Sequence, residues 1–507
     1  MTADSDGYLS HRQILVVMSG LMVGMFLAAL DQSIVGTALP RIVSDLGGLD
    51  QLSWVVTAYL LTSTAATPLW GKISDLYGRR PIFQAAIAIF LLGSVLAGLS
   101  QNMPQLIAFR ALQGIGGGGL MAIAFAVIGD VIPPRERGRY QGYFGAVFGV
   151  SSVAGPLLGG WFTDGPGWRW IFYINIPIGL VALVVTTLAL KLPTVRRERH
   201  IDYLGAALIV ASVSSLLLYL DWAGGEFGWM APGSLALLAA AVGLGALFVG
   251  AELRAKEPII PLRLFRNQVF AVGNAYAALA GVAMFGALIF MPLYLQAVQG
   301  MSPTQSGLAT LPTVAGIFLT SIGSGQLITK TGRYRIYPIV GAAILVGALL
   351  WLAQLRVETP YWQTAAMLFA FGAGLGFTLQ TITVAVQNAV GFRDLGAATS
   401  AVTFFRSLGG AIGAAVFGAV LTSRLAAYLA EGLGGAVAPG GGAIDANNVQ
   451  AIQALPEPAK GVVLEAFTHA LTDVFLAGVP FVALALVVAF FLKDIPLRSG
   501  EVPVEAR

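Results

Sequence analysis

The sequence of 507 residues contains no cysteine, which excludes a disulfide scaffold, a thiolate metal site and a cysteine nucleophile. Charged residues are scarce, at 11% of the chain against about 25% in a typical soluble protein. Because 57% of the residues are hydrophobic, too little polar material remains to cover water-soluble domains of this total length. The composition therefore predicts a polytopic membrane protein.

The sequence also lacks the arrangements that carry most enzymatic chemistry. No G-x-x-x-x-G-K-[ST] loop occurs, which excludes a P-loop ATPase. The three histidines, His11, His200 and His469, lie at or outside the ends of apolar stretches, where they cannot form a buried metal site or a catalytic triad. We therefore predict no enzymatic activity, no metal, no nucleotide and no other cofactor.

Fourteen mostly apolar stretches are present, each near the roughly 20 residues that a bilayer-crossing helix needs. They cover 13–39, 51–70, 81–99, 104–129, 139–162, 169–190, 202–220, 233–252, 269–295, 305–328, 336–355, 361–386, 397–421 and 470–492. Asp4 and Asp6 precede the first stretch and give a poor basic n-region, so an uncleaved first helix is predicted. The predicted fold class is an all-α membrane protein.

Lys and Arg are distributed unequally between the two sets of loops. With a cytoplasmic N-terminus, 22 of the 29 lie in inner loops and termini and five lie in outer loops, while Arg110 and Arg406 lie inside spans. The positive-inside rule then predicts that both termini are cytoplasmic and that the number of spans is even. The net charge of +4 is thus a signal of orientation, and no nucleic-acid binding is predicted.

Two loop patterns recur along the chain. The loop at 71–80 resembles that at 325–334, and the loop at 135–138 resembles that at 393–396. The two landmarks are 56 residues apart in the first half, from Arg79 to Arg135, and 60 apart in the second, from Arg333 to Arg393. We therefore predict two six-helix halves, a pattern typical of alternating-access transporters. The predicted units are a half at 1–190, a two-helix insert with basic linkers at 191–268, a half at 269–492 with a long outer loop at 422–469, and a cytoplasmic tail at 493–507.

Six motifs, in order along nearly the whole chain, resemble the fourteen-span drug:proton antiporters of the major facilitator superfamily. They are Asp31 within 30–40, the signature loop 71–80, the fourth-helix motif 110–116, the fifth-helix antiporter motif 155–160, and the segments 168–177 and 290–296. The resemblance implies a major facilitator fold with fourteen helices arranged 6+2+6 in a cell membrane. It also implies proton-coupled multidrug efflux, and hence antibiotic resistance, with a lipophilic small molecule and protons as ligands. A dedicated exporter of a lipid, siderophore or secondary metabolite is the alternative.

Asp31 is the only carboxylate well inside a predicted span, and a charge in hydrocarbon costs several kcal/mol, so a functional role and a partner are expected. At about 1.5 Å of rise per residue, Asp31 and Arg110 lie at similar depths in the outer half of the membrane. We predict Asp31 as the proton-coupling acid and Arg110 as its modulator; a fixed structural ion pair is the alternative.

Arg406, near the midplane, has no carboxylate at that depth in its own helix. It either lines a cavity for neutral, zwitterionic or partly anionic cargo or hydrogen-bonds to carbonyl groups of broken helices. Other polar or aromatic side chains in spans are cavity candidates, with plain helix packing as the alternative: Trp54, Tyr59, Gln113, Asn175, Asn274, Tyr294, Gln296 and Gln380.

The resemblance implies a conformational latch at the inner loop, formed by Gly71, Asp75, Gly78, Arg79 and Arg80. The second-half copy has Thr329 in place of Asp75, which predicts a weaker latch there. The antiporter motif is Gly155, Pro156, Gly159 and Gly160, for which closure of the outward cavity and plain packing both remain open.

Two further segments need separate interpretation. Gly114, Gly116 and Gly119 satisfy G-x-G-x-x-G, but they lie within an apolar span without a preceding strand, so no dinucleotide site is predicted. The polar segment 422–469, with helical spacing over 447–464, caps the outer mouth, meets a partner protein or is a passive connection.

Overall fold

The computed structural model describes residues 11–46, 52–132, 137–190, 202–224, 228–255, 257–391, 394–432, 456 and 458–497. In this part of the chain every predicted span coincides with helix. The helices are α1 (His11–Leu46), α2 (Leu52–Tyr77), α3 (Arg79–Leu99), α4 (Met103–Val131), α5 (Arg137–Asp164), α6 (Trp170–Tyr173), α7 (Asn175–Ala189), α8 (Tyr203–Gly224), α9 (Pro232–Glu252), η2 (Leu262–Arg266), α10 (Gln268–Ala297), α11 (Pro303–Ala309), α12 (Leu311–Thr331), α13 (Ile336–Leu352), α14 (Tyr361–Ala389), α15 (Leu395–Gly432) and α17 (Ala459–Phe490).

The helices are long and apolar enough to make the protein an integral membrane protein. Eleven helical segments in the described residues qualify as membrane spans by length and composition. Two shorter apolar segments, Val147–Thr163 and Ile336–Leu352, coincide with further predicted spans, and α2 covers the remaining one. The all-helical fold is confirmed, while the count of fourteen crossings stays a prediction.

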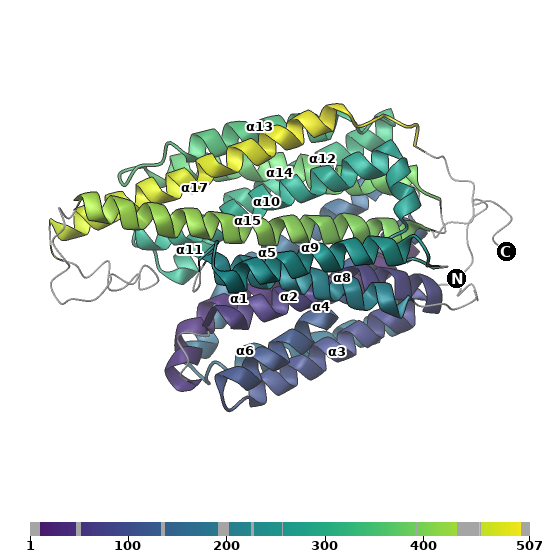
Figure 1. Cartoon of the computed structure of the whole chain (residues 1–507), viewed down its shortest axis with the longest axis horizontal. Coiled ribbons are helices and arrows are strands. Elements are labelled where there is room, and N and C mark those ends of the chain that lie inside the picture. Colours follow the sequence, from purple (N-terminus) through teal and green to yellow (C-terminus); the bar gives the residue numbers. More distant parts are fainter. Residues whose placement is uncertain are drawn as a thin grey trace.

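The bundle consists of two halves and an insert (Figure 1). Buried apolar residues of α1–α7 form two clusters in the first half, and those of α10–α17 form one large cluster in the second. The inserted pair α8–α9 packs through a fourth cluster against α2 of the first half and α15 of the second. The insert therefore lies against both halves.

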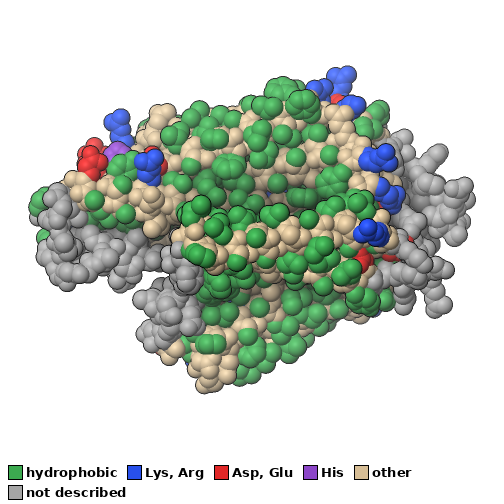
Figure 2. Space-filling model, viewed as in Figure 1, with side chains coloured by type: hydrophobic (Ala, Val, Ile, Leu, Met, Phe, Trp, Pro, Cys, Tyr) green, Lys and Arg blue, Asp and Glu red, His purple; other side chains and the backbone are tan. Residues whose placement is uncertain are grey.

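Charge is concentrated at the two ends of the bundle. Figure 2 shows a long hydrophobic flank, with most of the visible Lys and Arg side chains at the end where α1 begins and α17 ends. We call this the basic end, and it contains the loop 71–80 and the ion pair between Arg263 and Asp394. The distribution agrees with the charge asymmetry predicted from the loops.

Two helices extend into the segment predicted as the outer loop at 422–469. Helix α15 continues to Gly432 and α17 begins at Ala459, so both helices extend beyond the apolar stretches at 397–421 and 470–492. Hydropathy marks only the apolar part of a helix, and the polar extensions are held by side-chain contacts. The Tyr428 hydroxyl donates to Asp473 at 2.9 Å, and Arg424 pairs with Asp473 at 3.3 Å. Residues 433–455 lie outside the described residues.

The glycine run in α4 brings helix backbones into contact. The run is buried in the middle of a continuous helix with no preceding strand, so it does not have the setting of a dinucleotide-binding loop. A β-carbon at Gly116 would lie 2.5 Å from the backbone nitrogen of Phe90 and 2.6 Å from the carbonyl oxygen of Ala86, both on α3. Backbone atoms of a packed helix cannot move away, so close packing of small residues is what positions α4.

We expect Gly116→Ala to reduce the yield of folded protein strongly. The added methyl group would push α3 and α4 apart, and overpacking of this kind costs about 1–3 kcal/mol or more. Gly160→Ala is the matched control, because no described atom outside the adjoining backbone of α5 lies within 4 Å of a β-carbon at that position. Fluorescence size-exclusion chromatography of both variants measures the effect, and equal monodisperse yields would disprove it.

Candidate functional site

A buried charge cluster lies in the first half, where α1, α2, α3, α4 and α7 meet. Asp31 of α1 is completely buried and Arg110 of α4 is 1% exposed. Arg110 Nη1 lies 2.5 Å from Asp31 Oδ2, so the structure brings the two predicted partners together. A pair this deeply buried needs further hydrogen bonds to offset the cost of removing both ions from water.

Two amides complete the coordination of Asp31. Gln113 Nε2 and Asn175 Nδ2 both donate to Asp31 Oδ1 at 2.8 Å. Asn175 also donates to the Ser94 hydroxyl at 2.9 Å, and that hydroxyl donates to the Phe172 carbonyl group at 2.8 Å. Both carboxylate oxygens are therefore satisfied, by two side chains of α4 and one of α7.

Arg110 has acceptors besides the carboxylate. Its Nη1 donates to Gln113 Oε1 at 2.7 Å, and its Nε donates to the Val55 carbonyl group at 3.2 Å. The guanidinium carbon also lies 4.4 Å from the centre of the Tyr59 ring, a cation–π contact. If Asp31 lost its charge, Arg110 would keep these three interactions.

The sequence had placed Tyr59, Gln113 and Asn175 among the cavity candidates, and the structure puts them in this cluster. Ser94 was missed, because a lone serine in an apolar span carries no distinguishing signal. The hydrogen bond from Arg110 to the Val55 carbonyl group was also missed, since a backbone acceptor has no sequence signature. All side chains of the cluster are buried, so Asp31 has no contact with solvent in this structure.

The other cavity candidates are scattered. Trp54 meets Trp222 of the insert edge to face at 6.2 Å between ring centres. Tyr294 donates to the Arg356 carbonyl group at 2.8 Å, and Asn274 donates to that of Phe270 within its own helix. Gln380 is 7% exposed and its Oε1 accepts no hydrogen bond from the described residues, while Gln296 is partly buried. Their contact with cargo stays a prediction.

Arg406 on α15 binds its neighbour helix. Its Nη2 lies 3.3 Å from the Leu379 carbonyl oxygen and 3.3 Å from the Thr383 hydroxyl oxygen, both on α14. No carboxylate pairs with it among the described residues. The carbonyl contact was one of the two predicted alternatives, but α14 is continuous over Tyr361–Ala389 and not broken. The guanidinium group keeps donors for a further acceptor.

The inner loop motif forms a second charged cluster at the basic end. Arg79 pairs with Asp75 at 2.5 Å and with Asp130 at 2.6 Å, and its Nη1 donates to the Ser74 hydroxyl at 2.6 Å. Gly78 has φ 96°, a conformation that favours glycine and allows the sharp turn between α2 and α3. Asp130, at the end of α4, was missed because it follows its span directly.

This cluster contacts the second half. The Asp75 carboxylate lies so close to Gly396, in the first turn of α15, that a β-carbon there would overlap it. A negative charge at a helix N-terminus is stabilised by the unpaired N–H groups. Two further contacts join the halves and the insert at this end: Gln387 donates to the Phe125 carbonyl group at 3.2 Å, and Lys72 pairs with Glu257 at 2.5 Å. The basic end is therefore closed in this conformation.

The second-half copy of the inner loop motif and the antiporter motif make other contacts. In the second half, the Thr329 hydroxyl donates to the Gly325 carbonyl group of its own helix. In the antiporter motif, a β-carbon at Gly155 would overlap Ser33 of α1, whereas Gly160 has open space. Pro156 lies inside α5, and the Thr163 hydroxyl bonds to the carbonyl groups of Gly159 and Gly160. Arg135 and Glu136 lie outside the described residues.

We expect Arg79→Gln to lower the free energy of unfolding by on the order of 3 kcal/mol, because two largely buried carboxylates lose their cation. Equilibrium unfolding in mixed detergent micelles measures this. Arg80→Gln is the control, since Arg80 makes no ion pair within the described residues, and it should change the free energy by about 0.5 kcal/mol or less. Equal effects of the two variants would contradict the account.

The fold and the buried charge cluster define a multi-pass helical membrane protein with two packed halves. The family model of the Major Facilitator Superfamily matches residues 21–414. The chain therefore belongs to the major facilitator superfamily, whose members are transporters and not enzymes.

Comparison with individual proteins agrees with this family. An uncharacterised MFS-type transporter of Mycobacterium tuberculosis is 41% identical over 486 residues, covering 96% of this chain and 70% of the relative. The multidrug transporter protein MdtP of Bacillus subtilis is 37% identical over 523 residues, covering 98% and 96%. The structure of the proton:xylose symporter XylE superposes with a TM-score of 0.63 over 96% of this chain and 98% of that one, at 13% identity. At that identity the likeness shows the fold alone.

Proposed function

We propose that this transporter exports hydrophobic or amphiphilic compounds from the cytoplasm or inner leaflet in exchange for protons. The buried pair of Asp31 and Arg110 carries the proposal, because an ionisable group kept in a membrane interior indicates an ion pathway. The name of the relative MdtP supports multidrug efflux as the cargo class. The proposal includes fourteen crossings of a plasma membrane with both termini in the cytoplasm.

The chemistry of the cluster suits a proton that enters in one conformation and leaves in another. Protonation of Asp31 removes the charge that Arg110 pairs with, while Gln113 Oε1 and the Val55 carbonyl group remain as acceptors for Arg110. The pair can therefore separate while Arg110 stays hydrogen-bonded to these two acceptors. Helix movement that changes the burial of Asp31 or its distance from Arg110 would load or release the proton.

The energy source is then the proton gradient, with no cofactor. One charge that crosses about 100 mV yields roughly 2.3 kcal/mol, which supports an accumulation of about fifty-fold. Closure of the basic end by the Arg79 cluster fits one of the two states that alternating access requires.

Dye retention in cells tests the cargo class and the energy source together. Energised cells that express the protein should retain less of a lipophilic cationic dye than cells without it, and an uncoupler should restore retention. Export that persists with the uncoupler present would exclude proton coupling.

A dedicated exporter of a lipid, siderophore or secondary metabolite is the second candidate. Arg406, which has no carboxylate partner in the described part of the chain, favours cargo with anionic or acceptor groups. Transport of anionic but not cationic lipophiles would favour this candidate.

A further inference from the structure

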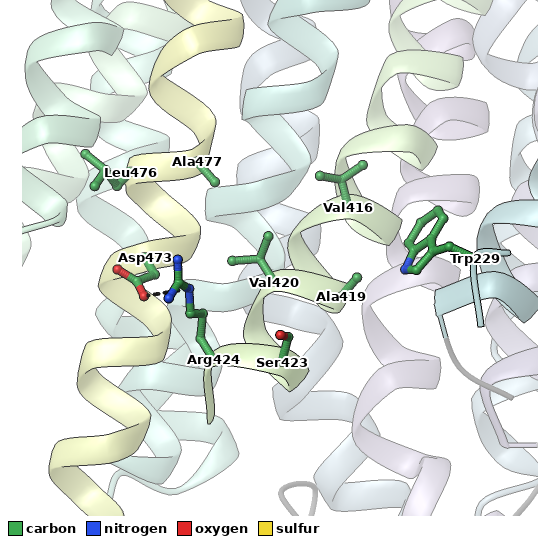
Figure 3. A pocket seen from close by; sticks show the side chains of 9 residues that line it. All are labelled: Trp229, Val416, Ala419, Val420, Ser423, Arg424, Asp473, Leu476 and Ala477. Atoms are coloured by element: carbon green, nitrogen blue, oxygen red, sulfur yellow. Dashed lines mark ion pairs between the residues drawn. The ribbon is translucent and has the colours of Figure 1, made fainter. Parts of the chain in front are cut away.

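A side pocket of about 530 Å³ lies at the end of the bundle opposite the basic end, away from the buried charge cluster. Figure 3 shows that its walls come from the outer parts of α15 and α17, with Trp229, from the turn between α8 and α9, on the opposite side. The pocket therefore lies between the insert and the second half.

One end of the pocket is polar and rich in hydrogen-bond donors. Arg424 Nε pairs with Asp473 at 3.3 Å, and Tyr428 donates to the same carboxylate oxygen at 2.9 Å (Figure 3 shows the ion pair). Within the described residues, neither the Nη groups of Arg424 nor the Ser423 hydroxyl nor the Trp229 indole N–H makes a hydrogen bond. Because Asp473 is already occupied, the free groups match an anionic oxygen-rich ligand.

The other end is apolar and partly exposed. Val416, Val420 and Ala477 line it together with Leu476, which is 50% exposed on α17, a helix long and apolar enough to span a membrane. Arg424 lies three residues beyond the predicted outer end of the span 397–421. The polar end is thus at the depth of lipid headgroups, and the apolar end is at the depth of acyl chains.

We propose that this pocket binds a phospholipid of the outer leaflet. The phosphodiester group accepts hydrogen bonds from Arg424 and Ser423, and one acyl chain lies along Val416, Val420 and Leu476, with Trp229 on the opposite wall. Arginine suits the role because its planar guanidinium group can donate two parallel bonds to one phosphate while it keeps its bond to Asp473. The bound lipid would fill the space between the insert and α15.

Native mass spectrometry of lipid-depleted protein tests the site. The protein is titrated with a palmitoyl-oleoyl phosphatidylglycerol, and the dissociation constant of the tightest lipid is compared between the wild type and the double variant Ser423→Ala, Arg424→Gln. We expect the variant to bind this lipid about tenfold more weakly, as the loss of charge-assisted hydrogen bonds implies. Arg41→Gln is the matched control, because Arg41 also pairs with an aspartate. The Arg41 side chain is 62% exposed and that of Arg424 is 60% exposed. The control should bind the lipid like the wild type.

The same titration with a phosphate-free diacyl glucolipid of identical chains separates headgroup recognition from nonspecific adsorption. We expect the wild type to bind the glucolipid as weakly as the double variant binds phosphatidylglycerol.

Three results would overturn the proposal. The first is equal binding of the two lipids by the wild type. The second is a loss of phosphatidylglycerol affinity in Arg41→Gln as large as the loss in the double variant. The third is displacement of the phospholipid by a lipophilic cationic dye at equimolar concentration, since the pocket would then be a cargo site. Unchanged elution on size-exclusion chromatography shows that both variants are folded.

Discussion

Asp31→Asn is expected to abolish cargo accumulation driven by a pH gradient while downhill exchange of cargo continues. Asparagine preserves the size of the side chain but carries no titratable proton, so the movements of cargo and proton are no longer linked. In proteoliposomes with a pH gradient equivalent to about 100 mV, the wild type should accumulate cargo by as much as about fifty-fold, and Asp31→Asn should not accumulate it. Accumulation of a radiolabelled lipophile by the two proteins measures this.

Loss of folding must be separated from loss of coupling in that experiment. The single variant leaves Arg110 as a buried cation without its carboxylate, a change that costs on the order of 3–5 kcal/mol. The double variant Asp31→Asn, Arg110→Gln removes both charges, so it should recover stability without recovering accumulation. Asp45→Asn, which changes a partly exposed acid near the other end of α1, is the control and should accumulate cargo like the wild type. Normal accumulation by Asp31→Asn would show that the pair is structural.

Gly396→Leu is expected to shift the transporter away from the conformation closed at the basic end. Leucine would occupy the space of the Asp75 carboxylate, which lies against Gly396 in this conformation. Overpacking costs about 1–3 kcal/mol, and because it acts on one conformation only, the ratio of the two populations should change by roughly 5- to 150-fold. The cytoplasmic loop would then act as a latch, as the resemblance to its superfamily implies.

The absence of cysteine makes the conformational shift measurable, since labels attach only where cysteines are introduced. Arg12→Cys and Arg333→Cys place spin labels at the basic ends of the two halves. Electron–electron distance measurements should show a longer separation in Gly396→Leu than in the background protein. Gly391→Leu is the control, because a β-carbon at Gly391 meets no atom of the described residues within 4 Å, apart from its chain neighbours. Identical distance distributions in all three proteins would contradict the latch.

The helices and the charged pair could be predicted from the sequence for physical reasons. A membrane span must be apolar over about 20 residues, so hydropathy located every long helix in the described residues. An acid and a base inside apolar stretches require partners, and depth along each helix was enough to match Asp31 with Arg110. Charge in hydrocarbon is so unfavourable that few arrangements satisfy it.

Contacts that depend on the angular positions of helices could not be predicted in this way. Depth alone did not reveal that Gln113 and Asn175 bind Asp31, since amides in a span can equally face a cavity or a neighbour helix. Asp130 and Arg79 are 51 residues apart, and nothing local to either one marks the pair. The extension of α15 was missed because polar helix beyond an apolar stretch has no hydropathy signal, whereas the helical spacing over 447–464 included the first residues of α17.

Proton movement itself tests the central claim most directly. Proteoliposomes that enclose a pH-sensitive dye are prepared without a pH gradient, and an outward gradient of a lipophilic cargo of constant charge is imposed at clamped membrane potential. Antiport predicts that the lumen becomes more acidic as cargo leaves, with no such change in empty liposomes or with Asp31→Asn. Cargo efflux from wild-type proteoliposomes at constant lumenal pH would contradict proton exchange and leave a facilitator.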